Sequence, residues 1–252
     1  MAARSVVVTG AESGIGAACA AAFGQTGDKV AILYFKDADA ANTSADAVRA
    51  AGGTAITVQC NVADEASVDA AFTAVEAQIG AATVLVNSAG LNMSGVEVRD
   101  MALDQWQRLI GTDLTGAFLA SRRFLKGCAG PGAIVHISSI HARDVRAGGA
   151  DYCAAKGGLT RLVETIAVEE AGRGIRCNAI QPGMILTPMN ARAETDVLFR
   201  KGLEEHIPMG RAGRPDEVAA MARWLASAEA GYVTGASFTI DGGLSLMAGL
   251  GA

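Results

Sequence analysis

Short apolar runs alternate with longer helix-compatible stretches along almost the whole chain. The apolar runs cover residues 5–9, 29–35, 54–60, 82–87, 133–138, 175–180 and 237–240. The helix-compatible stretches cover residues 39–51, 66–79, 104–126, 151–172 and 216–227. Such alternation predicts an α/β fold, a doubly wound parallel sheet with helices on both faces. Half of the residues are apolar, which suits strands buried on both faces. The length of 252 residues fits a single domain.

A glycine-rich turn follows the first apolar run. Gly10, Gly14 and Gly16 lie between residues 5–9 and a helix-compatible stretch at 17–23. A strand, a glycine turn and a helix in this order let the backbone approach a dinucleotide, whose phosphates bind the free N–H groups of the helix. The spacing G-x3-G-x-G is wider than the familiar G-x-G-x-x-G, and an ordinary tight turn is the plain alternative.

A tyrosine and a lysine stand four residues apart in one of the predicted helices. Tyr152 and Lys156 therefore share a helix face, and Ser139 lies thirteen residues before Tyr152, at the end of an apolar run. A nearby cation stabilises the phenolate form of a tyrosine, and such a phenol can exchange a proton with an alcohol or a carbonyl. The trio predicts a proton-transfer site, and an accidental pair on a surface helix is the plain alternative.

Together the two motifs resemble those of the short-chain dehydrogenase/reductase family, and the likeness runs from about residue 4 to Asp241-Gly242-Gly243. Asn87-Ser88-Ala89-Gly90 is similar to the Asn-Asn-Ala-Gly segment of that family. The resemblance implies a Rossmann-type domain over residues 1–252, a nicotinamide cofactor, and Ser139, Tyr152 and Lys156 as catalytic residues. It also implies that the following residues contact the cofactor: Gly10, Ser13, Gly14, Ile15, Gly16, Asn61, Val62, Asn87, Ala89, Gly90, Tyr152, Lys156, Pro182, Gly183, Ile185 and Thr187.

Two positions depart from the family pattern. Asp113 stands where the family usually carries a fourth catalytic residue, an asparagine that helps to organise a water molecule beside the lysine. An ionised aspartate accepts hydrogen bonds but cannot donate them, and its charge would stabilise protonated Lys156. Asn61 replaces an aspartate that touches the adenine amino group, and its side-chain carbonyl can still accept that bond.

The end of the second predicted strand bears on the choice of cofactor. An acidic residue usually holds the ribose hydroxyl groups of NAD there. Tyr34 occupies this place, and Lys36 could pair with the 2′-phosphate of NADP. No basic residue precedes Gly14, and Asp37 is close. The pattern favours NADP and leaves NAD possible, while Lys36 as a solvated turn residue is the plain alternative.

Within the family, several segments are most similar to those of bacterial glucose 1-dehydrogenases. The resemblance implies hydride transfer to or from a sugar or polyol, with Ser139, His141, Asn92 and Asn190 at the substrate. An NADPH-dependent ketone or 3-oxoacyl reductase is the alternative, because related reductases share these segments. A catalytically silent nucleotide-sensing regulator on the same fold is a further alternative.

The stretch from residue 184 to residue 212 is predicted to be a substrate lid, because it is a long insertion after a strand. Its methionines fit ordinary packing equally well. Of the three histidines, His136 is predicted to lie in the core and His206 on the lid.

The charge and the cysteine content of the chain bear on its binding partners and on its cellular location. The net charge of −5 and the lack of a basic patch argue against a nucleic-acid partner. Five scattered cysteines indicate free thiols in a reducing compartment, and neither a signal peptide nor a membrane helix is indicated, so a cytoplasmic location is predicted. The histidine spacing predicts no metal site. The family resemblance implies a homotetramer acting on a small molecule.

Overall fold

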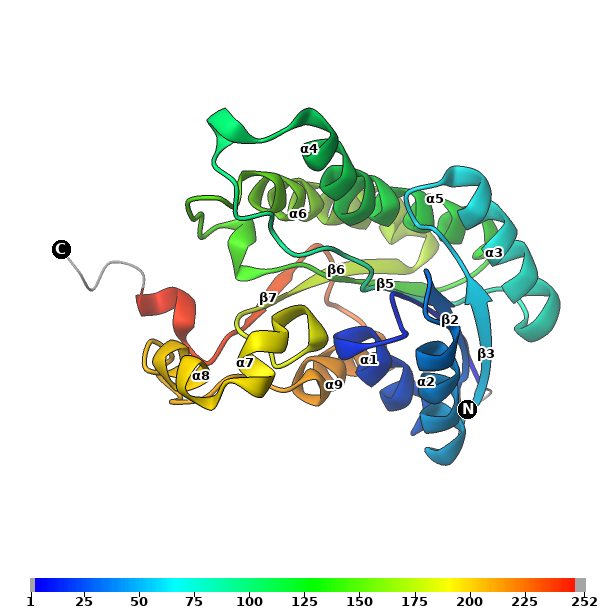
Figure 1. Ribbon diagram of the computed structural model, residues 1–252. Helices are drawn as coiled ribbons and strands as arrows, with labels where there is room; N and C mark the ends of the chain where they lie inside the picture. The colour runs from blue at the N-terminus through cyan, green and yellow to red at the C-terminus, as the bar shows by residue number, and fades with distance from the viewer. Residues whose placement is uncertain (1–2, 248–252) are drawn as a thin grey trace.

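Seven parallel strands form one sheet in the order β3-β2-β1-β4-β5-β6-β7 in the computed structural model, which describes residues 3–247 (Figure 1). The strands are β1 (Ser5–Thr9), β2 (Lys29–Tyr34), β3 (Thr54–Gln59), β4 (Val84–Asn87), β5 (Gly132–Ile137), β6 (Ile175–Pro182) and β7 (Ser237–Ile240). Each observed strand overlaps one of the predicted apolar runs. The predicted doubly wound parallel sheet is therefore confirmed.

Helices cover both faces of this sheet (Figure 1). One layer contains α1 (Gly14–Gly24), α2 (Ala38–Ala50) and α9 (Pro215–Leu225). The other contains α3 (Glu65–Ile79), α4 (Leu103–Ile110), α5 (Gly116–Gly127) and α6 (Ala150–Glu170). None of the helices within residues 3–247 is both long and apolar enough to cross a membrane.

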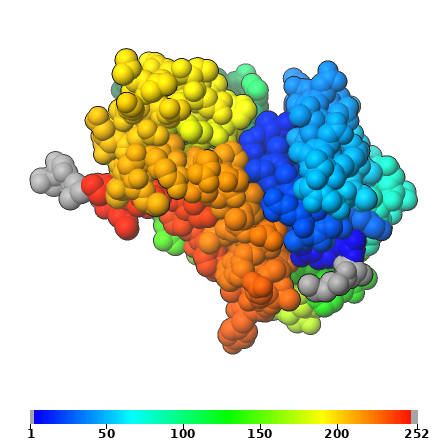
Figure 2. Space-filling view, turned by 90° about the horizontal axis from the view of Figure 1, so that it is seen from below, coloured from blue at the N-terminus to red at the C-terminus, as the bar shows by residue number. Residues whose placement is uncertain are grey.

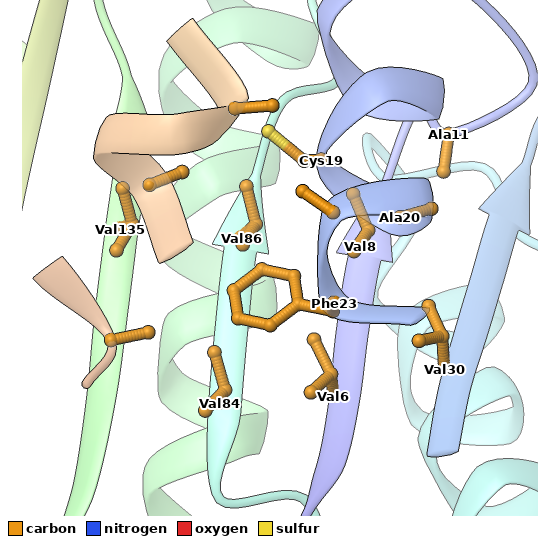
Figure 3. Packing of buried hydrophobic residues seen from close by; sticks show 14 of the residues in the cluster. Val6, Val8, Ala11, Cys19, Ala20, Phe23, Val30, Val84, Val86 and Val135 are labelled. Carbon is orange, nitrogen blue, oxygen red and sulfur yellow. The ribbon is translucent and has the colours of Figure 1, made fainter. Parts of the chain in front are cut away.

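Alternate residues of the strands serve the two helix layers. Val6 and Val8 of β1 pack in the core beneath α1, α2 and α9, whereas Val7 packs in the core on the opposite face. This follows from the two-residue period of a strand, which sends successive side chains to opposite faces. Figure 3 shows the ring of Phe23, from α1, among valines of β1 and β4, including Val6 and Val84. Large buried side chains of this kind fix α1 on the sheet.

The predicted helix over residues 104–126 is not one regular α-helix, and this expectation is corrected. The π-helical segment η2 (Gly111–Thr115) separates α4 from α5. The N–H group of Gly116 bonds to the carbonyl of Gly111, five residues earlier. An added Cβ at Gly116 would lie 2.9 Å from Cγ2 of Val62, so the backbone comes very close to the segment after β3. π-helical turns are found frequently at functional sites.

The segment predicted as a lid contains two short helices between β6 and α9. These are α7 (Ala191–Thr195) and α8 (Val197–Glu204), preceded by the 3₁₀ turn η5 (Pro188–Asn190). In the space-filling view the yellow helices stand beside a recess that separates them from the blue α1 (Figure 2). The segment therefore borders the carboxyl ends of the strands, while its movement as a lid stays a prediction.

The Phe23→Ala variant is expected to lower the free energy of unfolding by about 3–5 kcal/mol. Removal of the fully buried ring leaves a cavity that the surrounding valines cannot fill. Urea-induced unfolding followed by circular dichroism measures the change. Gln25→Ala, at the exposed end of the same helix, is the control and should leave the midpoint nearly unchanged. Equal midpoints for both variants would contradict the role of the Phe23 ring in the core.

Candidate active site

A cavity of about 1040 Å³ opens at the carboxyl ends of the parallel strands. Its walls include Gly10 after β1, Ala89 after β4, Ser139 after β5 and Pro182 at the end of β6. β1 lies between β2 and β4 in the sheet, so the chain runs to one side of β1 first and then to the other. Ligands of doubly wound folds bind where the strand order reverses in this way.

The glycine turn forms one wall of the cavity. Gly10 and Gly14 have φ angles of 62° and 55°, which side chains disfavour. An added Cβ at Gly16 would lie 2.2 Å from the carbonyl oxygen of Gly10. Helix α1 begins at Gly14, and its first turn faces the cavity. Because the first N–H groups of a helix lack partners within the helix, this turn fits the pyrophosphate of a dinucleotide.

Contacts of Thr9 and Gly10 hold the loop after β4 against this turn. The hydroxyl of Thr9 accepts hydrogen bonds from the N–H groups of Ser88 and Ala89, both at 3.1 Å. An added Cβ at Gly10 would lie 2.7 Å from Cα of Ala89. Two loops from neighbouring strands therefore form one continuous surface in the cavity.

The segment after β6 reaches across to the glycine turn. An added Cβ at Gly14 would lie 3.4 Å from the side chain of Thr187. The predicted residues Pro182, Gly183, Ile185 and Thr187 all line the cavity. The structure thus brings both ends of the predicted cofactor site into one space.

Tyr152, Lys156 and Ser139 all line the cavity. The ammonium nitrogen of Lys156 lies 5.3 Å from the centre of the Tyr152 ring, as the four-residue spacing predicts. Lys156 is 5% exposed and donates to the carbonyl of Ile137 at 3.3 Å. The hydroxyl of Ser139 accepts the N–H group of His141 at 3.1 Å, which fixes the turn after β5. The ring of His141 stands edge-on to Tyr152, with centres 6.2 Å apart.

Asp113 lies in the π-helical segment and forms a buried ion pair with Lys156. The distance from Oδ2 to Nζ is 3.1 Å, and Asp113 is 1% exposed. Its other oxygen accepts the N–H group of Leu91 at 2.8 Å. Burial lowers the pKa of Lys156, but the negative charge of Asp113, the phenolate form of Tyr152 and the hydrogen bond to Asp113 raise it, and the net pKa lies above its ordinary value. The ammonium form is therefore the stable form of Lys156, as the sequence predicts from this carboxylate.

Three predicted cofactor residues lie outside the cavity wall. Tyr34 is half-buried and packs against the core beneath α1 and α2. Lys36 is exposed, and its ammonium nitrogen lies 4.9 Å from the centre of the Phe35 ring. Asn87 is buried, and its amide nitrogen donates to the hydroxyl of Ser121 at 3.1 Å. The side chains of Tyr34 and Asn87 pack inside the protein, and that of Lys36 lies on the surface beside Phe35.

His136 is buried beside Asn87, which confirms the prediction of a core histidine. Its Nδ1 lies 3.4 Å from the Asn87 amide nitrogen. Burial, and then the nearby charge of Lys156, lower the pKa of His136 to about 3. It is neutral in the folded protein at ordinary pH and adds no charge under the site.

The predicted substrate residues line the cavity, but protein groups already occupy most of their polar atoms. The amide of Asn92 donates to the carbonyl of Met189 at 3.4 Å, and the amide of Asn190 donates to that of Ile185 at 2.9 Å. Nδ1 of His141 lies 2.6 Å from the carbonyl of Asp144. The remaining predicted residues, Ser13, Ile15, Asn61, Val62 and Gly90, also face the cavity.

Several residues of the cavity wall were not selected from the sequence. They include Glu12, Phe35, Met93, Met184, Met189 and Leu244. Glu12 could have been found, because it is an acidic residue inside the glycine turn itself. The apolar residues gave no such signal, since methionines and leucines are ordinary core residues. Within the described part of the chain, no cluster of three or more histidine, cysteine, aspartate or glutamate residues could hold a metal ion.

Comparisons with known proteins agree with this geometry. A family model described as Enoyl-(Acyl carrier protein) reductase matches residues 10–245. The 3beta-hydroxysteroid dehydrogenase 1 of Eggerthella lenta is 41% identical and covers 98% of this chain and 95% of its own. Glucose 1-dehydrogenase 2 of Bacillus subtilis is 37% identical, and the match covers 96% of this chain and 95% of the Bacillus protein.

A solved structure matches the whole fold as well. The short-chain dehydrogenase/reductase from Serratia marcescens has a TM-score of 0.90 and 33% identity, and the match covers 96% of this chain and 98% of the Serratia chain. The chain belongs to the short-chain dehydrogenase/reductase family. Like its relatives in this family, it is an NAD(P)-dependent oxidoreductase.

In this short-chain dehydrogenase/reductase, the Asp113→Asn variant is expected to move the pH profile of alcohol oxidation to lower pH by about one unit. Loss of the carboxylate charge leaves the cation of Lys156 uncompensated, so that it stabilises the phenolate of Tyr152 more strongly. Asparagine retains a side-chain oxygen for the N–H group of Leu91. Steady-state rates of alcohol oxidation between mildly acidic and alkaline pH measure the shift.

The control for this variant is Asp104→Asn, which removes an exposed carboxylate from the first turn of α4. It should leave the profile in place. A profile for Asp113→Asn that is unchanged, or moved to higher pH, would contradict the charge argument.

Proposed function

We propose that the protein catalyses reversible hydride transfer between a nicotinamide cofactor and a substrate alcohol or ketone, with Tyr152 as the proton-exchanging residue. One observation carries the proposal: Tyr152, Lys156 and Ser139 meet beside a cavity that also contains the glycine turn. A bound nicotinamide supplies or takes up the hydride. The protein residues then have to position the substrate oxygen and move its proton.

Each member of the trio has a separate role in this proposal. Tyr152 gives its proton to the carbonyl oxygen in reduction, or takes the hydroxyl proton in oxidation. Lys156 stays charged because the carboxylate of Asp113 pairs with its ammonium group and outweighs the effect of burial, and it stabilises the phenolate form of Tyr152. The Ser139 hydroxyl holds the substrate oxygen while its own lone pair accepts the His141 N–H group.

The substrate we propose is an alcohol carried on a ring. Both curated relatives are named for such compounds, a hydroxysteroid and glucose. The wall of the cavity supports the less polar of these classes, because it contains Met93, Met184, Met189 and Leu244. The amide groups of Asn92 and Asn190 each use an N–H group on a backbone carbonyl, which reduces the donors that they offer to the hydroxyl groups of a sugar. Turnover of a sugar or polyol stays a prediction from the sequence.

Cofactor choice is part of the proposal. The sequence favours NADP because Lys36 could hold a 2′-phosphate, yet the Lys36 ammonium lies over the ring of Phe35 and outside the cavity wall. The same wall contains a carboxylate, that of Glu12. We therefore propose NAD as the preferred cofactor, because a carboxylate repels the negative charge of a 2′-phosphate.

We also propose a homotetramer, as the family resemblance implies. Exposed apolar side chains on the long helices support it, among them Leu103 of α4, Phe118 of α5 and Val168 of α6. Light scattering coupled to size-exclusion chromatography measures the mass directly. The predicted cytoplasmic location stays a prediction.

Tyr152→Phe is expected to lower kcat by about 100- to 10,000-fold, because phenylalanine keeps the ring but has no proton to exchange. Binding of NADH, measured by fluorescence titration, should persist, which shows that the fold and the cofactor site are intact. Near-full turnover by this variant would refute the proposed role of Tyr152. An active wild-type enzyme excludes the alternative of a silent nucleotide sensor.

The substrate class is tested by following nicotinamide absorbance with a panel of alcohols and ketones. A 3β-hydroxysteroid, a simple cyclohexanol, glucose and a polyol probe oxidation, and a cyclic ketone and a 3-oxoacyl thioester probe reduction. We expect the highest kcat/KM for the weakly hydroxylated ring alcohols. Preference for glucose would favour the sugar prediction, and activity only on the thioester would move the protein to the 3-oxoacyl reductases.

A further inference from the structure

The end of β2 contributes no carboxylate to the cavity. Tyr34, at the position where an acidic residue would hold the ribose of NAD, packs against the core. The next residue, Phe35, lines the cavity and is 48% exposed. Asp37 is engaged elsewhere, because its side chain accepts the N–H group of Ala40 at the start of α2. If ribose hydroxyl groups are recognised here by a charged acceptor, it must come from another element.

Glu12 brings a carboxylate to this place from the glycine turn. One oxygen, Oε1, accepts the N–H group of Phe35 at 3.2 Å. The N–H group of Ala11 donates to the carbonyl of Leu33 at 3.1 Å, so the turn itself is fastened to the end of β2. The other oxygen, Oε2, is buried and has no hydrogen-bond partner among the described residues. The carboxylate is thus held by one oxygen, while the other, at a residue that lines the cavity, lacks a hydrogen-bond donor within the described part of the chain.

An unpartnered carboxylate oxygen discriminates strongly between two possible ligands. Ribose hydroxyl groups are hydrogen-bond donors, and a bond to a charged acceptor is among the stronger hydrogen bonds. A 2′-phosphate carries negative charge and offers mainly acceptors, so it meets both repulsion and an unsatisfied oxygen. The ammonium group of Lys36 lies over the ring of Phe35, 4.9 Å from its centre, and within residues 3–247 it forms no ion pair with Glu12.

We propose that Glu12 makes this enzyme select NAD over NADP, by accepting hydrogen bonds from the adenosine ribose and by excluding a 2′-phosphate. The inference rests on the proposed use of a nicotinamide cofactor. The glycine turn then determines the choice between NAD and NADP, a choice that a carboxylate at the end of β2 would otherwise make. Glu12 acts on the choice of dinucleotide and has no part in the transfer of the hydride or the proton.

The test is direct binding of NADH and NADPH, measured by fluorescence titration without any substrate. We expect the wild-type protein to bind NADH about 10- to 100-fold more tightly than NADPH. Glu12→Gln keeps the size of the side chain and an acceptor for the Phe35 N–H group but removes the charge. Glu12→Ser removes both the charge and the acceptor for the Phe35 N–H group. In each variant the ratio of the two dissociation constants should fall by at least about tenfold.

Two further variants show whether the preference depends on Glu12 or on a neighbouring charge. Asp39→Asn removes an exposed carboxylate in the first turn of α2, and the binding ratio should stay within about twofold of the wild-type value. Lys36→Ala tests the rival expectation, and a selective loss of NADPH binding in that variant would favour a phosphate site at Lys36. Thermal unfolding of each variant confirms that the comparison is made between folded proteins.

The possible failures are distinguishable. Tighter binding of NADPH by the wild-type protein, or an unchanged ratio in both Glu12 variants, would overturn the role of Glu12 and leave the oxidoreductase proposal standing. Absence of binding for both dinucleotides would overturn the nicotinamide assignment itself, and the role of Glu12 with it.

Discussion

A buried ion pair between Asp113 and Lys156 ties together the segments that form the floor of the active site. The two charges lie 3.1 Å apart, and both side chains are almost completely withdrawn from solvent. Either charge buried alone would cost several kcal/mol, so the π-helical segment and α6 pack together with the pair formed. The same carboxylate receives the N–H group of Leu91, and Lys156 donates to the end of β5. The position of Tyr152, one helical turn before Lys156, follows from these anchors.

The π-helical segment allows one helical stretch to meet two different neighbours. One extra residue in a turn rotates all later side chains by about 100° relative to a regular helix. Asp113 can therefore face Lys156, while Leu119 and Phe124 of α5 still pack in the core under the sheet. Gly116 brings the same backbone against Val62, so the segment after β3 is also part of the wall. A regular helix would lose one of these contacts.

Sequence patterns predict the parts of this molecule that depend on local periodicity. The strands and most helices follow from alternating apolar runs, and the shared helix face of Tyr152 and Lys156 follows from their spacing. The π-helical segment could not be found in this way, because the contacts of Gly116 with Val62 and of Asp113 with Lys156 are tertiary. Tyr34 and Asn87 stand at strand ends that reach the cavity, but their side chains turn toward packing partners that only the fold reveals. Glu12 stands out in the sequence as an acidic residue of the glycine turn, but its bond to the N–H group of Phe35 is tertiary and only the fold reveals it.

Two carboxylates of the cavity wall place negative charge at different parts of the site. Glu12 lies in the glycine turn, and Asp113 lies beside Lys156. Because the pKa of Lys156 is raised, its ammonium group keeps its proton through the neutral and mildly alkaline range. Lys156 therefore cannot be the group whose titration controls the rate in that range, and neither can His136, whose pKa lies near 3. A rate that changes with pH in that range therefore depends on a group other than Lys156 and His136.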